Sequence, residues 1–497
     1  MLIRPQSSDI KLVGFQLGRV LYVVGIAGII PLVWAIIDRD WHSASSFIFM
    51  IGLALAIAAS VERFRPKEEH AGWHHGMVTV ALVWLVVPAL GAIPLALSRH
   101  YGRPLDAFFD AMSGVTTTGL ALIQDVDHLA SSINVWRSAL QFLGGQGIVL
   151  AALMFFGGGG VLALYHGEAR DERIFPSVGS TARFIWSVSL FHAVFGITAL
   201  WAVGSFILGF HPMRSLLHAI TIFMSAFDTG GFAPMSTSIG YYHSVTYESV
   251  IGVLMVAGAL SFGAHYALWR GPRNLLRNLE ARTILTTFAG TLIIALFGLA
   301  ATGLYTDGLS LGRQGFFQLL SAHTGTGFST VPPADLIRWS GLAFGGITIA
   351  MALGGMGSST AGGVKALRIG LTVRSLWNTV KEALLPEGSV ISNRYSQGSP
   401  KVLHPELAQS VMTISLLYVG LYLLGTAVGI AYGVPLQQAM FESVSAGASV
   451  GLSVGVVDPT MPVILELVYV LQMWIGRLEF VAVFALVGFV VSWVVGE

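Results

Sequence analysis

The sequence predicts an all-α polytopic membrane protein. Two amino-terminal spans precede four similar units, each a span, a short pore helix, a glycine loop and a second span, set around a single pore. Three observations predict this fold. Of 497 residues, 54% are hydrophobic and 11% are charged, with a mean hydropathy of +0.73. Apolar stretches of bilayer-crossing length recur along the chain. A short phrase containing glycine occurs four times between apolar segments.

Composition also excludes several classes of protein. A soluble domain carries about 25% charged residues, far more than this chain. The formal net charge is +1, and there is no cysteine, no basic arm and no metal-type Cys and His spacing. We therefore expect no nucleic-acid partner and no structural metal site. The first apolar stretch lacks a small-residue cleavage site, so we interpret it as a retained span rather than a signal peptide.

Ten stretches approach the roughly 20 apolar residues that a helical span requires. They are Val20–Ile37, Ser43–Val61, Val78–Leu97, Trp136–Phe156, Phe184–Leu208, Ser249–Trp269, Ile284–Leu304, Leu342–Leu371 with an interruption, Val411–Tyr432 and Val463–Val494. The first two form a separate pair, and the other eight form four units. The predicted divisions are residues 1–72, 73–170, 171–275, 276–400 and 401–497.

The repeated phrase places a Ser six residues before a Gly that Leu or Phe follows. It reads Ser-Gly-Val-Thr-Thr-Thr-Gly-Leu from Ser113, Ser-Ala-Phe-Asp-Thr-Gly-Gly-Phe from Ser225, Ser-Ala-His-Thr-Gly-Thr-Gly-Phe from Ser321 and Ser-Ala-Gly-Ala-Ser-Val-Gly-Leu from Ser445. Glycine lets the backbone turn its carbonyls toward an axis, and carbonyl rings replace the hydration shell of a cation in channels. The alternative is that these glycines serve helix packing. Packing explains the phrase less well, because turn-forming residues such as Pro234 and Pro332 follow it.

The last four residues before each Leu or Phe form the predicted selectivity filter. They are Thr116, Thr117, Thr118, Gly119, Asp228, Thr229, Gly230, Gly231, Thr324, Gly325, Thr326, Gly327, Ala448, Ser449, Val450 and Gly451. Eight of these residues are predicted to bind the cation through backbone carbonyls: Thr117, Thr118, Asp228, Thr229, Thr324, Gly325, Ala448 and Ser449.

A short apolar segment precedes each phrase and is too brief to cross a bilayer, so we expect it to be re-entrant. These segments are Leu105–Ser113, Arg214–Ser225, Arg313–Ser321 and Leu436–Ser445. A prolyl residue stands just before three of them, which favours the start of a helix. Asp110, Gln318 and Glu442 lie three residues before the repeated Ser, and Ile222 takes this position in the second unit. We expect the polar three to brace the loops by hydrogen bonds rather than to bind the ion.

The distribution of Lys and Arg predicts the orientation of the chain. With the amino terminus in the cytosol, inner segments hold 19 of the 27 basic residues, as the positive-inside rule requires. The glycine loops then face the external half of the membrane. Nearby are five acids that either enrich cations or are ordinary solvated loop residues: Asp125, Asp127, Asp307, Asp335 and Asp458.

Within the interrupted span, the run from Gly354 to Gly363 is unsuited to a helix, since each Gly costs about 1 kcal/mol relative to Ala. We predict an intramembrane gate below the filter, although a loose inter-helix loop is the alternative. A phosphate-binding loop is excluded, because Gly363-Val364 stands where Lys-Ser or Lys-Thr is required. The predicted gate residues are Gly354, Gly355, Gly357, Ser358, Ser359, Thr360, Gly362, Gly363 and Arg477.

Arg477 lies 14 residues into the last apolar stretch, where a charge is costly and faces a cavity or a partner. Facing the pore, Arg477 forms an electrostatic barrier to cations. Alternatively, it is buried against Glu442 or a loop carbonyl. Glu479 is two residues away, so in a continuous helix it lies on a different face.

Over roughly residues 75–495, these motifs resemble the Trk/Ktr/HKT superfamily of potassium-translocating proteins, the bacterial Trk type most of all. The resemblance rests on the glycine loops, Gly144-Gly145-Gln146-Gly147, the run from Gly357 to Lys365, and Gly476-Arg477-Leu478-Glu479. It implies one pore, a gate at Gly354–Gly363, a homodimer and a cytosolic nucleotide-binding regulatory ring. In sodium-conducting members a Ser replaces the first filter glycine; all four positions here are Gly, which favours potassium.

From the resemblance we expect potassium uptake across the cytoplasmic membrane of a prokaryote, with the potassium ion as cargo. The chain has no Gly-x-Gly-x-x-Gly βαβ unit, so we expect no nucleotide site within it. The alternative is a secondary transporter that couples potassium to protons or sodium, for which His192 is the most plausible titratable group. An enzyme is not expected, because Ser358 and Ser359 lack a nearby His and Asp partner set. We also expect the apolar spans to contact membrane lipids.

Overall fold

The computed structural model describes residues 6–63, 72–147, 178–305, 307–386, 393–397 and 399–495, and these are mostly helical. The first half contains α1 (Ser7–Ala27), α2 (Ile29–Ile37), α3 (Trp41–Glu62), α4 (Trp73–Leu97), α5 (Pro104–Val115), α6 (Ser131–Gln146), α9 (Val178–Ala202), the π-helix η1 (Val203–Ile207), α10 (Pro212–Phe227), the 3₁₀ helix η2 (Ser238–Tyr242) and α11 (Val245–Ala259). The second half contains α12 (Phe262–Arg270), α13 (Pro272–Leu276), α14 (Leu279–Thr302), α15 (Gly308–Thr324), α16 (Pro333–Ile337), α17 (Gly341–Leu353), α18 (Ala366–Leu384), β1 (Arg394–Gln397), β2 (Ser399–Val402), α19 (Pro405–Ala431), α20 (Leu436–Gly447), α21 (Val463–Leu478) and α22 (Val481–Val495).

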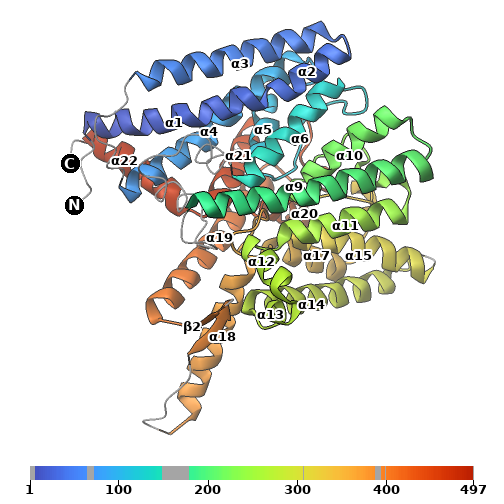
Figure 1. Ribbon diagram of the computed structural model, residues 1–497. Helices are drawn as coiled ribbons and strands as arrows, with labels where there is room; N and C mark the ends of the chain where they lie inside the picture. The colour runs from blue at the N-terminus through green and yellow to red at the C-terminus, as the bar shows by residue number, and fades with distance from the viewer. Residues whose placement is uncertain are drawn as a thin grey trace.

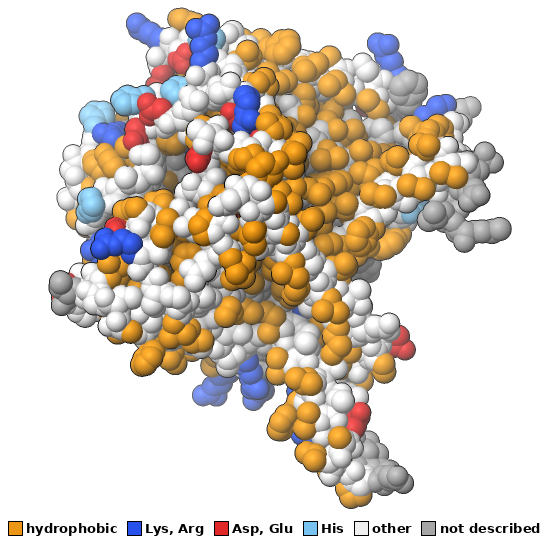
Figure 2. Space-filling view, turned by 180° about the vertical axis from the view of Figure 1, so that it is seen from behind, with side chains coloured by type: hydrophobic (Ala, Val, Ile, Leu, Met, Phe, Trp, Pro, Cys, Tyr) orange, Lys and Arg blue, Asp and Glu red, His pale blue; other side chains and the backbone are white. Residues whose placement is uncertain are grey.

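Long apolar helices dominate the architecture, and several of them, such as α1, α3, α9 and α14, run roughly parallel in Figure 1. Within the described residues, six helical segments are long and apolar enough to cross a membrane, or up to eight if each of two bent pairs is one span. Figure 2 shows apolar side chains over a broad area of one face, with Lys and Arg toward its margins. This surface suits a hydrocarbon environment, and the chain is a multi-pass membrane protein.

Most predicted spans correspond to helices, with shifted ends. The first expected stretch belongs to a longer element, Ser7–Ile37, and α3, α4, α9 with η1, α14 and α19 correspond to five others. The expected span from Trp136 begins as α6, but the part beyond residue 147 lies outside the described residues. The predicted total of ten is therefore not reached in the described part of the chain.

Two of the predicted spans are not continuous helices but pairs of helices with a sharp bend between them. Between α11 and α12 the bend is 104°, and between α21 and α22 it is 110°. At the first bend Leu260 is extended, and the hydroxyl of Ser261 accepts from the Ala264 N–H to begin α12. At the second bend, Glu479 and Phe480 have φ values of 53° and 73°. Such left-handed residues end a helix without glycine or proline.

The interrupted span behaves as predicted at its centre, where residues 354–365 leave the helix between α17 and α18. Beyond this break, α18 and a hairpin of β1 and β2 project from the helical bundle (Figure 1). The strands are antiparallel, with Arg394 opposite Val402. This hairpin corrects the all-α expectation, although only for a few residues.

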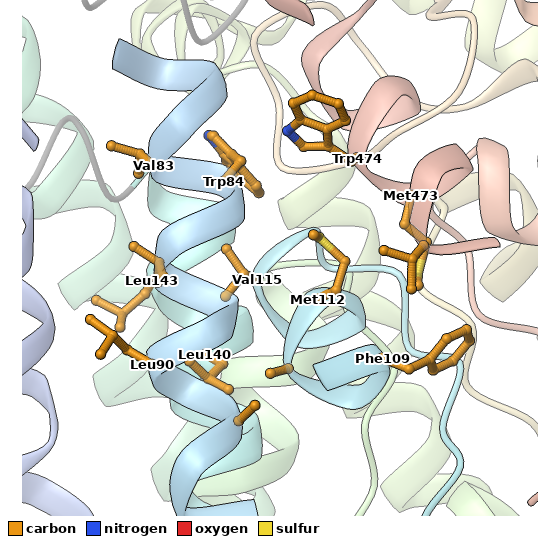
Figure 3. Close-up of a cluster of buried hydrophobic side chains, with 14 of the residues drawn as sticks. Val83, Trp84, Leu90, Phe109, Met112, Val115, Leu140, Leu143, Met473 and Trp474 are labelled. Atoms are coloured by element: carbon orange, nitrogen blue, oxygen red, sulfur yellow. The ribbon is translucent and has the colours of Figure 1, made fainter. Parts of the chain in front are cut away.

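The four short segments are helical and extend beyond their predicted limits, as α5, α10, α15 and α20. In α5, Phe109, Met112 and Val115 lie on one face and are completely buried. Figure 3 shows them between side chains of α4 and α21, including Trp84 and Met473. In a membrane protein such close packing stabilises through van der Waals contact rather than through removal of apolar surface from water. Packing therefore holds a helix that is too short to be stable alone.

Candidate functional site

Each short helix leads into its glycine loop through the same backbone hydrogen bond. The carbonyl of the repeated Ser accepts the N–H of the residue five positions later. The four bonds are Thr118 N to Ser113 O at 2.8 Å, Gly230 N to Ser225 O at 2.7 Å, Thr326 N to Ser321 O at 2.9 Å and Val450 N to Ser445 O at 2.9 Å. These loop amides are thus bonded back to the short helix that precedes them.

Two positions in every loop adopt a positive φ. The residue four after the Ser has φ between 50° and 72° (Thr117, Thr229, Gly325 and Ser449), and the residue six after it has φ between 76° and 95° (Gly119, Gly231, Gly327 and Gly451). Non-glycine residues in this region cost about 1–3 kcal/mol and persist only where the surroundings require them. The four loops therefore share one backbone shape despite different sequences.

The second of these positions is glycine because the loops touch there. A Cβ on Gly119 would overlap the Gly230 carbonyl, and one on Gly231 would overlap the Thr326 carbonyl. The same holds for Gly327 against Val450 and for Gly451 against Thr118. The contacts run from the first loop to the second, third and fourth and back to the first. Segments from four distant parts of the sequence thus form a closed ring, which we call the glycine ring.

The glycine ring lies between a cavity and the predicted gate segment. On one side, a cavity of about 560 Å³ is lined by Gly119, Gly231, Gly327 and Gly451 together with the segments that follow them. On the other side lies the predicted gate segment. A Cβ on Gly362 would overlap the Ala448 carbonyl, and one on Gly325 would reach the Gly362 amide. The gate segment therefore lies directly against the third and fourth loops.

Partners from several elements hold the gate segment, residues 354–365. Met356 N–H donates to the Ala259 carbonyl (3.0 Å), and the Thr360 hydroxyl donates to the Gly258 carbonyl (2.9 Å). These carbonyls are at the end of α11, so the bend after Ala259 and the gate segment stabilise each other. The amide of Gly357 donates to the buried Glu280 carboxylate of α14 (3.1 Å).

Arg477 connects the glycine ring to the gate segment. Its guanidinium donates to the Thr117 hydroxyl (3.0 Å), to the Thr360 carbonyl (2.6 Å) and to the Gly144 carbonyl at the end of α6 (2.9 Å). The contacts with carbonyls correspond to one of the two expected arrangements, while the contact with Thr117 keeps the positive charge beside the first loop. Glu442, the other expected partner, accepts hydrogen bonds from the segment after Gly451.

Three charged residues to which the sequence interpretation gave no individual role also form contacts within or beside the gate segment: Glu280, Lys365 and Arg368. Arg368 of α18 pairs with Glu479 at the bend between α21 and α22, and Lys365 donates to the Ala361 carbonyl. Glu280 contacts the gate segment, as described above. Arg368 and Glu479 are 111 residues apart, so no local spacing pointed to their pairing.

The five acids near the loops all accept hydrogen bonds from other loop residues or from the start of a helix. Asp127 accepts from the Ser236 amide (2.8 Å), and Asp307 caps α15 through the Ser310 amide (2.7 Å). The other three contact His128, Arg338 and Thr460: these are Asp125, Asp335 and Asp458. Hydrogen bonds from His128 lower the pKa of Asp125, because they favour the charged form of its carboxyl group. These contacts favour the interpretation as ordinary loop residues, one of the two alternatives that the sequence left open.

Apolar spans around a closed ring of four glycine loops define the class: a multi-pass membrane protein of the ion-transport type. The family model for the TrkH cation transport proteins matches residues 44–490, and the chain belongs to this family. It is thus a member of the predicted superfamily.

The similar proteins cover nearly the whole chain. An uncharacterized cation transporter of Methanocaldococcus jannaschii is 31% identical over 98% of this chain and 97% of its own length. The Trk system potassium uptake protein TrkH of Halomonas elongata is 28% identical, with coverages of 95% and 96%. The crystal structure of the potassium transporter TrkH from Vibrio parahaemolyticus has a TM-score of 0.81 at 23% identity, covering 96% of this chain and 98% of that one. This last likeness concerns the fold.

Proposed function

We propose that this chain takes up potassium across the cytoplasmic membrane of a prokaryotic cell through a gated, channel-like pore. The observation that carries the proposal is the glycine ring, in which four loops of one backbone shape meet around an axis. Loop amides that bond back to their own helices leave carbonyls available to replace the hydration shell of a cation. The Halomonas elongata relative, a Trk system potassium uptake protein, supports potassium as the cargo.

The pore requires no fuel within this chain. An inside-negative potential supplies about 2.3 kcal/mol per charge per 100 mV, which is sufficient to accumulate a monovalent cation. The cavity on the outer side of the glycine ring is the external vestibule in this proposal, and the amino terminus is cytosolic. Gly354–Gly363 act as the gate, and Arg477 adds a positive barrier beside the first loop.

We further propose a homodimer regulated by a cytosolic nucleotide-binding partner. The support is the projection formed by α18 and the hairpin, which carries exposed Val373, Leu376 and Trp377 on one helical stripe. The helix begins directly after the gate segment, so force applied to α18 acts on the gate. Arg368, on the same helix, also pairs with the bend at Glu479.

Ion flux into liposomes that contain this chain alone tests the proposal, with potassium and sodium compared. We expect a potassium current down the gradient. Gly119→Ser is expected to lower the total flux, because its Cβ meets the Gly230 carbonyl, and to raise the share of sodium in the flux that remains, because it restricts φ and adds a hydroxyl ligand. Obligatory exchange with protons or sodium would favour the secondary transporter instead. In that case His192 is a poor coupling group, since its ring bonds to the Val188 carbonyl of its own helix (2.9 Å) and stacks on Phe227. An unchanged flux ratio in Gly119→Ser would remove Gly119 from the filter.

A further inference from the structure

Three of the short helices carry a buried acceptor that holds the chain beyond the filter glycine. Asp110 accepts from the Leu122 amide at 2.6 Å, Gln318 from the Thr330 amide at 3.4 Å, and Glu442 from the Val454 amide at 2.8 Å. In each case the amide belongs to the residue three positions after the glycine. All three acceptors are fully buried. The predicted hydrogen bonds from these three side chains to their loops are confirmed, and the donor is the backbone amide at the equivalent position of each loop.

The second loop lacks both partners of this bond. Ile222 stands at the acceptor position, and Pro234 stands three residues after Gly231. Proline has no backbone N–H, so the apolar side chain leaves no donor unsatisfied there. The loss of the acceptor and the loss of the donor compensate each other within this unit.

Gln141, from α6 of the first unit, holds the second loop instead. Its side-chain amide donates to the Gly230 carbonyl, and its oxygen accepts from the Phe232 amide at 3.2 Å. One fully buried side chain thus contacts the backbone on both sides of Gly231. The second loop is positioned from outside its own unit, whereas the other three have an acceptor on their own short helix.

We propose that Asp110, Gln318, Glu442 and Gln141 are positioning residues that set the spacing of the glycine ring and thereby its preference for potassium over sodium. This inference rests on the proposed function of the ring. Each acceptor fixes the segment that leaves a loop, and an orphaned buried amide would draw that segment toward another partner. The adjoining glycine carries the contact between neighbouring loops, so a shift there changes the distances between facing carbonyls.

Direct ion binding fits these side chains less well than positioning does. Asp110 also accepts from the Tyr101 hydroxyl (2.9 Å) and lies 3.5 Å from the Arg137 guanidinium, which neutralises it. That guanidinium stacks over the ring of Phe232, 4.2 Å from its centroid. The contacts of Asp110 therefore extend, through Arg137, to the residue that follows Gly231.

The decisive comparison is between Glu442→Gln and Glu442→Leu, each reconstituted in liposomes for reversal potentials with potassium and sodium. Glu442→Gln keeps an acceptor oxygen and is expected to retain the permeability ratio of the parent. Glu442→Leu removes it, and we expect about a fivefold drop in the ratio, the change that corresponds to roughly 1 kcal/mol. Ile222→Leu is the matched control, with no expected change.

The outcomes separate this inference from the proposed function. If the parent carries no selective potassium current, the proposed function fails. If the parent is selective and Glu442→Leu keeps its ratio, even with lower thermal stability, the residue is merely structural and the inference is overturned. If Glu442→Leu does not fold, Gln318→Leu takes its place, because it removes the longest of the three bonds.

Rescue in the second loop provides an independent measurement. Gln141→Leu is expected to lower the potassium-to-sodium ratio, and adding Ile222→Gln with Pro234→Ala supplies the acceptor and donor that the other units have. Recovery of the ratio in the triple variant supports a positioning role for this bond. A Gln141→Leu protein that folds with an unchanged ratio would contradict it.

Discussion

The glycine ring and the gate segment are both rich in glycine and both non-helical, but they are held in different ways. Each loop of the ring bonds its amides to its own short helix, as Thr118 does to Ser113 and Val450 to Ser445. The gate segment takes many of its partners from elsewhere: α11 carbonyls, Glu280 and Arg477. Every loop of the ring is thus bonded to its own short helix, and the second loop is also held by Gln141 of α6, so the ring keeps its shape when neighbouring helices move. A segment secured by other elements changes when they move.

Glycine itself serves two purposes in these regions. At Gly327 the absence of a Cβ permits contact with the Val450 carbonyl of the next loop. At Gly357 the nearest atom to an added Cβ is the carboxylate oxygen of Glu280, at 3.0 Å, so the constraint there comes from one side chain. Substitutions in the ring therefore meet backbone, whereas this position in the gate segment meets a side chain that can move. The following predictions test how the glycine ring and the gate segment are each held, from the largest expected effect to the smallest.

Gly327→Ala is expected to remove most of the potassium flux and to lower stability. A Cβ would overlap the Val450 carbonyl, and the φ of 86° alone costs a non-glycine residue about 1–3 kcal/mol. Flux assays and thermal unfolding in detergent measure both effects. Gly290→Ala is the matched control, because that exposed glycine of α14 has no atom within 4 Å of an added Cβ. Parent-like flux and selectivity in Gly327→Ala would contradict the ring as the filter.

Arg368→Gln is expected to destabilise the protein by about 3–5 kcal/mol if the pair behaves as a buried one, and to raise basal flux. The side chains of Arg368 and Glu479 are only 16% and 11% exposed, and their pair joins α18 to the bend after α21. Arg338→Gln breaks an exposed pair with Asp335 and is expected to change stability by no more than about 1 kcal/mol. Equal effects of the two variants would show that α18 is not held in this way.

Substitution of Arg477 separates charge from tethering. Arg477→Lys keeps the positive charge but loses the forked contacts with Thr360 and Gly144, whereas Arg477→Gln loses the charge as well. If the barrier is electrostatic, Arg477→Lys keeps a low basal flux and Arg477→Gln leaks. If the contacts matter more, both variants leak, and each lost charged hydrogen bond costs about 1.5–3 kcal/mol. The measurement is basal flux in the absence of any cytosolic partner. Low basal flux in both variants would exclude Arg477 from the gate.

Much of the glycine ring could be predicted because the chain repeats it. Alignment of four phrases identified the required glycines, the short helices before them and the equivalent positions of Asp110, Gln318 and Glu442. The break at Gly354–Gly363 was equally visible, since its glycines and hydroxyl residues are unsuited to a helix. These features depend on local sequence.

The remaining features depend on contacts between distant residues. The bend at Glu479 and Phe480 has no glycine or proline. Glu479 at this bend pairs with Arg368 of α18. Gln141 contacts Gly230, which is 89 residues away, so no local pattern pointed to this bond. The sequence therefore predicted the repeated parts of the site and missed those in which one unit departs from the others.

The repeated Ser itself provides the smallest prediction, because its hydroxyl has a different role in different units. In the first and fourth loops it accepts from the glycine amide, Gly119 at 2.9 Å and Gly451 at 3.0 Å. In the third loop the Ser321 hydroxyl is buried and has no hydrogen-bond partner among the residues that the structure describes. Ser113→Ala and Ser445→Ala are expected to cost about 0.5–1.5 kcal/mol each, the net value of a hydrogen bond. Ser321→Ala should cost nothing measurable, as thermal unfolding of the three variants will show. A comparable loss in Ser321→Ala would mean that the Ser is retained for packing in every loop, and that the hydroxyls of the first and fourth loops contribute little to the shape of the ring.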